Sequence, residues 1–269
     1  MMNNPSERAD VRFAFFGTAP LKDAVLTELA RIGYVPEKIV EFESLTPELI
    51  AELEKTPWDV FIVASYGRKI PKEVLAMPRR GAVNLHPSLL PRLRGPSPIR
   101  SAILNDQKET GVSIMLLDEE LDHGPIIAQK KVAVPEWPPH GCALDELLAL
   151  EGSMLLATVL PLWLKGEIDA QPQNHDLATY CSAFKKEDGL LDLRGDGYTN
   201  LLKIRALEGW PGTYTFFERA GKKLRVQILE AHLVGGKLVV DRVKPEGKKE
   251  MGYEEFLRSG ARPVSVRSN

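Results

Sequence analysis

The stretch Asn84-Leu85-His86-Pro87-Ser88-Leu89-Leu90-Pro91-Arg92-Leu93-Arg94-Gly95 predicts the end of a strand and the start of a polar loop. Residues two apart in a strand point to the same face, so we expect Asn84 and His86 to lie side by side. Pro87 and Pro91 then end the pairing, because proline has no N–H to donate to a ladder. A polar pair at a strand end, followed by a loop, is typical of the sites of open α/β proteins.

A carboxylate that could complete such a site lies downstream. Residues 112–117 are predicted to form another strand, and an acidic loop at 118–125 follows it. Asn84, His86 and Asp122 at neighbouring strand ends would be suited to acid–base chemistry. Each residue type alone is more often a turn former or a plain loop residue, so the pattern by itself leaves the site open.

The segments around this stretch alternate between apolar strands and amphipathic helices, which predicts a doubly wound, mostly parallel α/β sheet. The expected strands are 11–16, 38–42 and 59–64, and the expected helices are 21–32, 47–55, 71–76 and 98–104. A long apolar-striped helix is predicted at 143–164. Its core candidates are Leu147, Leu150, Met154 and Leu155.

The pattern changes after a polar, proline-containing segment at 166–176, which is predicted to be a linker. Short strands are expected at 213–217, 224–229 and 237–241, with Ala220-Gly221 and Gly235-Gly236 as turns between them. This pattern predicts a small OB-like β-barrel. The sequence therefore predicts two domains, residues 1–172 and residues 173–269.

Composition predicts a soluble enzyme. The chain has 269 residues, of which 43% are hydrophobic and 27% are charged. We expect no membrane span, and residues 1–7 lack the apolar core of a signal peptide. Two cysteines, Cys142 and Cys181, provide neither a disulfide framework nor zinc-type spacing. The expectation is a monomeric cytoplasmic protein.

Charge divides unevenly along the chain. Residues 181–269 carry a net charge of +5 and residues 1–180 a net charge of −7. A small basic β-domain beside an acidic enzyme domain favours a nucleic-acid substrate. A solvated basic face would explain the charge equally well.

Three blocks resemble, in the same order, those of the folate-dependent formyltransferases. They are the motif Asn84-x-His86-x-Ser88-Leu89-Leu90-Pro91-x-x-Arg94-Gly95 and the segments 110–114 and 121–127. Segments 208–214 and 244–258 resemble the C-terminal domain of the family members that formylate methionyl-tRNA. The resemblance implies the fold of those enzymes over most of the chain.

The resemblance also implies a reaction, in which a formyl group moves from 10-formyltetrahydrofolate to the amino group of initiator methionyl-tRNA, in support of translation initiation. Asn84 would donate to the oxygen that gains charge, with a protonated His86 as a second donor. Asp122 would hold His86 in its required protonation state or relay the amine's proton, and the formal base stays open. The implied folate pocket comprises Ser88, Leu89, Leu90, Pro91, Tyr66, Leu117 and Asp118. The implied tRNA contacts are Arg92, Arg94, Lys248 and Lys249.

One region departs from the family pattern. Between Gly33 and Trp58 the chain is shorter and lacks the basic, glycine-containing loop that approaches the tRNA acceptor end in the family. A small amine, either glycinamide ribonucleotide or an amino sugar nucleotide, therefore stays an alternative acceptor. A hydrolase and a non-catalytic RNA-binding protein are further alternatives.

A metal site is the remaining interpretation of this region. His86, Asp122 and His123 are residue types that bind metals. Adjacent Asp and His side chains in one loop seldom converge, and no Cys or Glu completes the set. We therefore expect no metal.

Overall fold

The computed structural model describes residues 11–41 and 45–264, and the chain divides into two compact units. Unit 1 comprises Met1–Pro98, Glu109–Ala133 and Glu146–Cys181, and unit 2 comprises Ile99–Lys108, Val134–Asp145 and Ser182–Asn269. The boundary predicted between residues 172 and 173 thus lies within the last segment of unit 1. Residues 1–7, where no signal peptide is expected, lie outside the described residues, as does the end of the strand predicted at 38–42.

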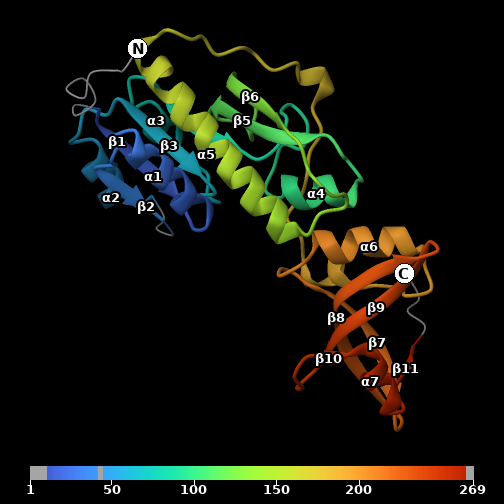
Figure 1. Ribbon diagram of the computed structural model, residues 1–269. Helices are drawn as coiled ribbons and strands as arrows, with labels where there is room; N and C mark the ends of the chain where they lie inside the picture. The colour runs from blue at the N-terminus through green and yellow to red at the C-terminus, as the bar shows by residue number, and fades with distance from the viewer. Residues whose placement is uncertain (1–10, 42–44, 265–269) are drawn as a thin grey trace. The chain divides into compact units, whose positions relative to one another are not determined.

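Unit 1 contains a six-stranded sheet in the order β2-β1-β3-β4-β5-β6 (Figure 1). The first four are parallel, β5 runs antiparallel to β4, and β6 runs antiparallel to β5. The predicted mostly parallel α/β sheet is confirmed. The strands are β1 (Phe13–Gly17), β2 (Lys38–Val40), β3 (Val60–Ala64), β4 (Ala82–His86), β5 (Thr110–Leu116) and β6 (Ile126–Val132).

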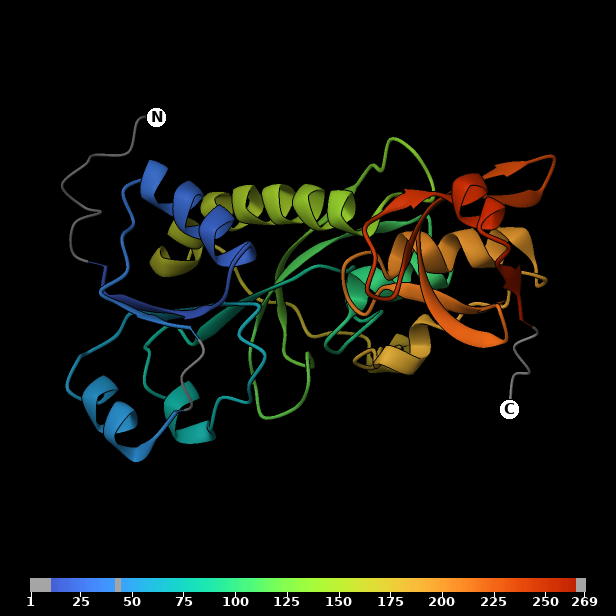
Figure 2. The ribbon, with the colours of Figure 1, turned by 90° about the horizontal axis from the view of Figure 1, so that it is seen from below.

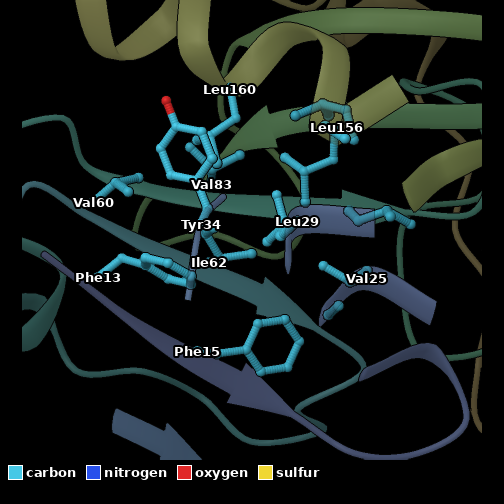
Figure 3. Close-up of a cluster of buried hydrophobic side chains, with 14 of the residues drawn as sticks. Phe13, Phe15, Val25, Leu29, Tyr34, Val60, Ile62, Val83, Leu156 and Leu160 are labelled. Atoms are coloured by element: carbon cyan, nitrogen blue, oxygen red, sulfur yellow. The ribbon is translucent and has the colours of Figure 1, made fainter. Parts of the chain in front are cut away.

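Two layers of helices cover this sheet (Figure 2). Helices α1 (Leu21–Arg31) and α5 (Gly141–Lys165) supply one face, and α2 (Pro47–Leu53) and α3 (Lys72–Leu75) supply the other. Alternate residues of β1 face opposite ways: Phe15 joins the core under α1 and α5 (Figure 3), and Phe16 joins the core under α2 and α3. Strands buried on both faces explain why the apolar runs are continuous. The short helix α4 (Pro98–Leu104) follows the loop after β4.

Helix α5 packs on the core with a different face from the predicted one. Leu150 and Met154 are 51% and 41% exposed, whereas Leu156 and Leu160 lie in the core beside Val83 (Figure 3). The prediction of Leu150 and Met154 as core residues is therefore wrong, and Leu147 and Leu155 are only half-buried. Apolar residues occur around the whole helix, so periodicity alone does not select the buried face.

The same helix is long and apolar enough to cross a membrane by length and composition alone, the one such helix among the described residues. That observation is weak evidence for a span, because core helices of soluble proteins pass the same test. Its packing on the sheet provides another reason for its apolar composition.

Unit 2 is built on a five-stranded antiparallel sheet in the order β10-β9-β8-β7-β11. Both predicted turns lie between its strands, and Ala220-Gly221 and Gly235-Gly236 have positive φ throughout. Among the described strands, no hydrogen-bonded pairing joins β10 to β11. The core side chains include Phe217, Val226 and Phe256. The elements are α6 (Gly197–Ala206), β7 (Thr213–Arg219), β8 (Lys222–Val234), β9 (Lys237–Pro245), β10 (Met251–Gly252), α7 (Tyr253–Arg258) and β11 (Arg262–Pro263).

A carboxylate joins three segments of unit 2. Asp106 Oδ1 accepts hydrogen bonds from Trp137 Nε1 at 2.6 Å and from the Tyr198 hydroxyl at 2.8 Å. Both bonds lower the pKa of Asp106, and the bond from Trp137 has the larger effect. A lowered native pKa stabilises the fold at a pH above the unfolded pKa, near 3.9, and this stabilisation is lost as the pH falls through the native value.

We therefore expect Asp106→Asn to lower the free energy of unfolding at pH 7 by more than it does at about pH 3. Urea unfolding of both proteins at the two pH values measures this difference. An equal loss at both would show that the carboxylate's charge contributes nothing.

Candidate active site

Asn84 and His86 end strand β4 at the carboxyl edge of the parallel strands. Both are buried, at 8% and 4% exposure, and both follow Ala82 on the α2–α3 face of the sheet. The alternate residues of β4, Val83 and Leu85, face the other core. The two-residue period of the strand thus places the amide and the imidazole on the same face, as the sequence predicts.

The His86 ring is oriented by a backbone carbonyl. His86 Nε2 lies 3.0 Å from the oxygen of Leu93, and a carbonyl oxygen only accepts hydrogen bonds, so Nε2 carries a proton. The other ring nitrogen, Nδ1, faces Asp122 Oδ1 at 3.6 Å. Nε2 is therefore engaged by the backbone, and Nδ1 is the ring nitrogen that faces the carboxylate.

Asp122 reaches His86 by a route that the sequence does not predict. Because β5 is antiparallel, its last residue, Leu116, pairs with Val83 and not beside His86. Asp122 does follow a strand that neighbours β4, but the end of β5 lies near the start of β4, so the loop after β5 returns toward the end of β4. Asp122 is 8% exposed there, and its Oδ2 accepts the Gly95 N–H at 2.7 Å.

Backbone strain is concentrated around these side chains. Five described residues other than glycine have positive φ, and three belong to this region: Ser65 after β3 (+56°), Leu93 (+57°) and Asp122 (+47°). Such conformations cost about 1–3 kcal/mol each and persist where surrounding contacts enforce them. The segment from Leu93 to Gly95 supplies contacts to both His86 and Asp122, so one short loop positions both groups.

The Asn84 amide is available to a ligand. It is buried, and within the described part of the chain no hydrogen bond engages its side chain. Most buried amides are hydrogen-bonded, so this one has unused capacity to donate. The Asn84 amide therefore fits a carbonyl oxygen that gains negative charge.

Hydrogen bonds from serine side chains hold the backbone of the loop that is implied as part of the folate pocket. Ser113 Oγ donates to the Ser88 oxygen at 2.6 Å and accepts the Leu90 N–H at 3.1 Å. Ser88 Oγ donates to the Arg92 oxygen at 2.7 Å, and Leu90 is buried. The half-buried side chains of the loop are Leu89 and Pro91.

Three further residues implied in folate binding lie around a second loop or in the core. The Tyr66 ring is 6% exposed and packs edge-on against Phe16, and Leu117 is half-buried against the same cluster. Asp118 Oδ2 lies 2.7 Å from His123 Nδ1, and its Oδ1 accepts the Glu120 N–H at 2.9 Å. Asp118 is the charged member of this set, and its carboxylate is already hydrogen-bonded.

The residues implied in tRNA binding are divided between the units. Arg92 is exposed in unit 1, and Lys248 and Lys249 are exposed in unit 2, in the turn between β9 and β10. Arg94 differs, since it is 2% exposed and donates to Gln173 Oε1, to the Tyr180 hydroxyl and to His175 Nδ1. The guanidinium of Arg94 is thus enclosed and hydrogen-bonded within unit 1, and its implied contact with tRNA stays a prediction.

The side chains considered as metal ligands point to different partners. His86 and Asp122 face each other, whereas the His123 ring stacks on His175 with centroids 4.1 Å apart. Over residues 11–41 and 45–264, no group of three or more His, Cys, Asp or Glu side chains could hold a metal ion.

Residues of the predicted linker and the segment just after it lie beside the site. Gln171, in the linker, pairs with Ile126, and Thr179, three residues beyond its end, accepts the Leu93 N–H with Oγ1 at 2.9 Å. Gln173 is 5% exposed and touches the Asp122 loop. A polar, irregular segment has no periodicity from which to predict burial, so the sequence offers no signal for these contacts.

Comparison with known proteins agrees with the sheet and the strand-end site. The Formyl transferase family matches residues 19–158, which is about half of the chain. The chain belongs to the formyl transferase family, and the resemblance seen in its sequence is confirmed.

Curated relatives of the chain include methionyl-tRNA formyltransferases. A methionyl-tRNA formyltransferase from Chloroflexus aurantiacus is 42% identical over 180 residues, which cover 67% of this chain and 57% of the relative. One from Dictyoglomus thermophilum is 36% identical over 252 residues, covering 83% of this chain and 78% of the relative. The chain thus spans less than two thirds of the first relative's length.

Solved structures share the fold at low identity. A methionyl-tRNA formyltransferase from Clostridium thermocellum has a TM-score of 0.65 at 20% identity, covering 87% of this chain and 98% of that one. A sugar N-formyltransferase from Shewanella has a TM-score of 0.67 at 20% identity, covering 83% of this chain and 99% of that one. HypX from Aquifex aeolicus, solved with tetrahydrofolic acid, has a TM-score of 0.69 at 18% identity. The match covers 92% of this chain and 46% of HypX.

Proposed function

We propose that the chain transfers a formyl group from 10-formyltetrahydrofolate to the α-amino group of initiator methionyl-tRNA. The observation that carries the proposal is the buried His86–Asp122 pair beside the unengaged Asn84 amide. The methionyl-tRNA formyltransferases among the relatives support this acceptor. The reaction would occur in the cytoplasm, would need no metal and would support translation initiation, with the protein acting as a monomer.

The site residues divide the chemistry between them. Bound 10-formyltetrahydrofolate would supply the formyl group. The amine nitrogen bonds to the formyl carbon, the bond from that carbon to folate N10 breaks, and tetrahydrofolate leaves when N10 receives the proton that the amine lost. Asn84 donates to the oxygen on which negative charge develops, an interaction that is strongest in the transition state. The His86–Asp122 pair takes up the proton that the amine loses. Within the described residues, Asp122 Oδ1 accepts no hydrogen bond, so it is the open acceptor of the pair.

Binding of the reduced folate is proposed for the two loops beside this site. HypX, a structural neighbour, was solved with tetrahydrofolic acid, which supports a folate ligand for the shared fold. The loop of Ser88, Leu89, Leu90 and Pro91 and the loop of Leu117 and Asp118 would form its walls, with Tyr66 supporting them from the core. The rigid hydrogen bonding of Leu90 favours a preformed wall.

Unit 2 is proposed to bind the tRNA. Its sheet carries two cation–aromatic pairs, with Arg225 over Tyr214 at 3.9 Å and Lys223 over Phe216 at 4.0 Å. A cation is attracted to the face of an aromatic ring, and it keeps its charge there. Together with the net charge of +5 over 181–269, these pairs favour a polyanionic partner.

We expect Lys248→Glu with Lys249→Glu to weaken tRNA binding and to flatten its salt dependence. Each lost phosphate contact should reduce the slope of log K against log salt by roughly 0.7–0.9. Filter binding at several salt concentrations measures both effects. Lys55→Glu, on an exposed residue of unit 1, is the control for a charge reversal alone. An unchanged slope in the double variant would remove these lysines from the tRNA surface.

A formyl-transfer assay with competing acceptors tests the function itself. Charged initiator tRNA, glycinamide ribonucleotide and an amino sugar nucleotide are offered side by side with 10-formyltetrahydrofolate. We expect kcat/KM for the tRNA to exceed that for either small amine. Formylation of a small amine with none of the tRNA would overturn the proposal and would favour the alternative acceptor.

A further inference from the structure

From the contacts of a buried amide we infer that Gln173 is a positioning residue that holds Asp122 in its reactive conformation, with Arg94 as the group that orients Gln173. The inference rests on the proposed function for its kinetic test. It assigns a role to a segment that the sequence marks only as a linker.

The Gln173 side chain bridges the two peptide carbonyls of the Asp122 turn. Its Nε2 donates to the oxygen of Asp122 at 2.9 Å and to that of Gly124 at 2.7 Å. Both amide hydrogens are therefore used, and both serve a turn whose first residue has a φ of +47°. A non-glycine residue in this region needs outside contacts to hold it, and Gln173 supplies two.

Arg94 determines which way the amide faces. Gln173 Oε1 accepts from Arg94 Nε at 3.1 Å and from Nη2 at 2.7 Å. A guanidinium only donates and a carbonyl only accepts, so a flipped amide would face wrong partners on both sides. Arg94 has no ion-pair partner among the described residues. Its charge polarises the amide, which strengthens the amide's own donation to the Asp122 turn.

A second contact fixes the other end of Asp122. The Gly95 N–H donates to its Oδ2, and Gly95 directly follows Arg94. Arg94 itself is anchored, because its N–H donates to the Thr179 oxygen and its oxygen accepts the Cys181 N–H, each at 2.8 Å. The carboxylate and the backbone of Asp122 are thus held by two branches of one buried network.

The test uses two variants that both lose the two N–H donors of Gln173 and differ in charge and in the acceptor that they offer to Arg94. Gln173→Glu keeps the side-chain length and an acceptor for Arg94 but adds a charge. Gln173→Met adds no charge but removes the acceptor. Gln171→Glu is the matched control, because Gln171 is exposed and contacts Ile126 through its backbone.

We expect both Gln173 variants to lower kcat about 10- to 100-fold, the scale of a small misplacement of a reacting group, with KM values near those of the wild type. Combining either variant with Asp122→Asn should add little further loss, because Gln173 acts through Asp122. Multiplicative losses, or an unchanged kcat in both variants, would overturn the inference.

A readout without turnover separates this inference from the proposed function. Hydrogen exchange of the Gly95 amide, which Asp122 protects, should accelerate in both Gln173 variants and stay unchanged in Gln171→Glu. The Leu117 amide, which follows β5 and donates to the oxygen of Ala82 in β4, is the internal reference. Unchanged exchange at Gly95, or equal acceleration at Leu117, would also overturn the inference. A wild-type protein inactive with every acceptor would instead refute only the proposed function.

Discussion

Asp122→Asn is expected to lower kcat for formyl transfer by about a hundredfold or more while the fold survives, because the change removes the acceptor for the amine's proton. Asparagine is accommodated at a φ of +47°, and its amide oxygen can accept the Gly95 N–H as the carboxylate does. The loss therefore reports the charge of the carboxylate and not the shape of the loop. Steady-state kinetics with charged tRNA measures kcat, and circular dichroism shows whether the variant is folded.

The control for this variant lies in the same loop. Glu120 is an exposed carboxylate two residues before Asp122, and Glu120→Gln removes a charge of the same sign. Its kcat should match that of the wild type. Turnover by Asp122→Asn near the wild-type rate would remove Asp122 from the catalytic set.

Asn84→Ala and His86→Ala should lower kcat on a similar scale, since each removes a group that acts in the transition state. The triple variant should lose much less than the product of the three single losses, because the groups act as one unit.

Phe217→Ala is expected to lower the free energy of unfolding by about 3–5 kcal/mol, the largest effect of any single core change that we consider. Phe217 is fully buried in unit 2, and its ring lies edge-on to Phe256 with centroids 5.0 Å apart. Removing it leaves a cavity at the centre of the core of unit 2. Urea unfolding followed by circular dichroism measures the loss.

The neighbouring residue provides a matched control. Phe216 is half-buried on the opposite face of β7, where Lys223 lies over its ring. Phe216→Ala removes the same atoms from a more exposed place, so its loss should be much smaller. Equal losses would contradict the assignment of the buried face of this sheet.

Local patterns in the sequence determined the parts of the fold that depend on near neighbours. The period of two in β4 places Asn84 and His86 on one face, and it does so in any sheet that contains this strand. Turn chemistry located Gly235-Gly236, whose backbone needs positive φ at both positions. Continuous apolar strands between helices identified a sheet covered on both faces.

Only the tertiary structure decided how distant segments meet. The antiparallel direction of β5 sends Asp122 to His86 by a returning loop, and nothing in an apolar strand reveals its direction. The buried face of α5 was also undetermined, because apolar residues surround the helix. Arg94 belongs to the interior because Gln173, 79 residues later, accepts its charge-assisted hydrogen bonds. Gln173 then reaches Asp122 across 51 residues. Hydrogen bonds of this kind join segments that have no common period, so they arise only when the whole chain has folded.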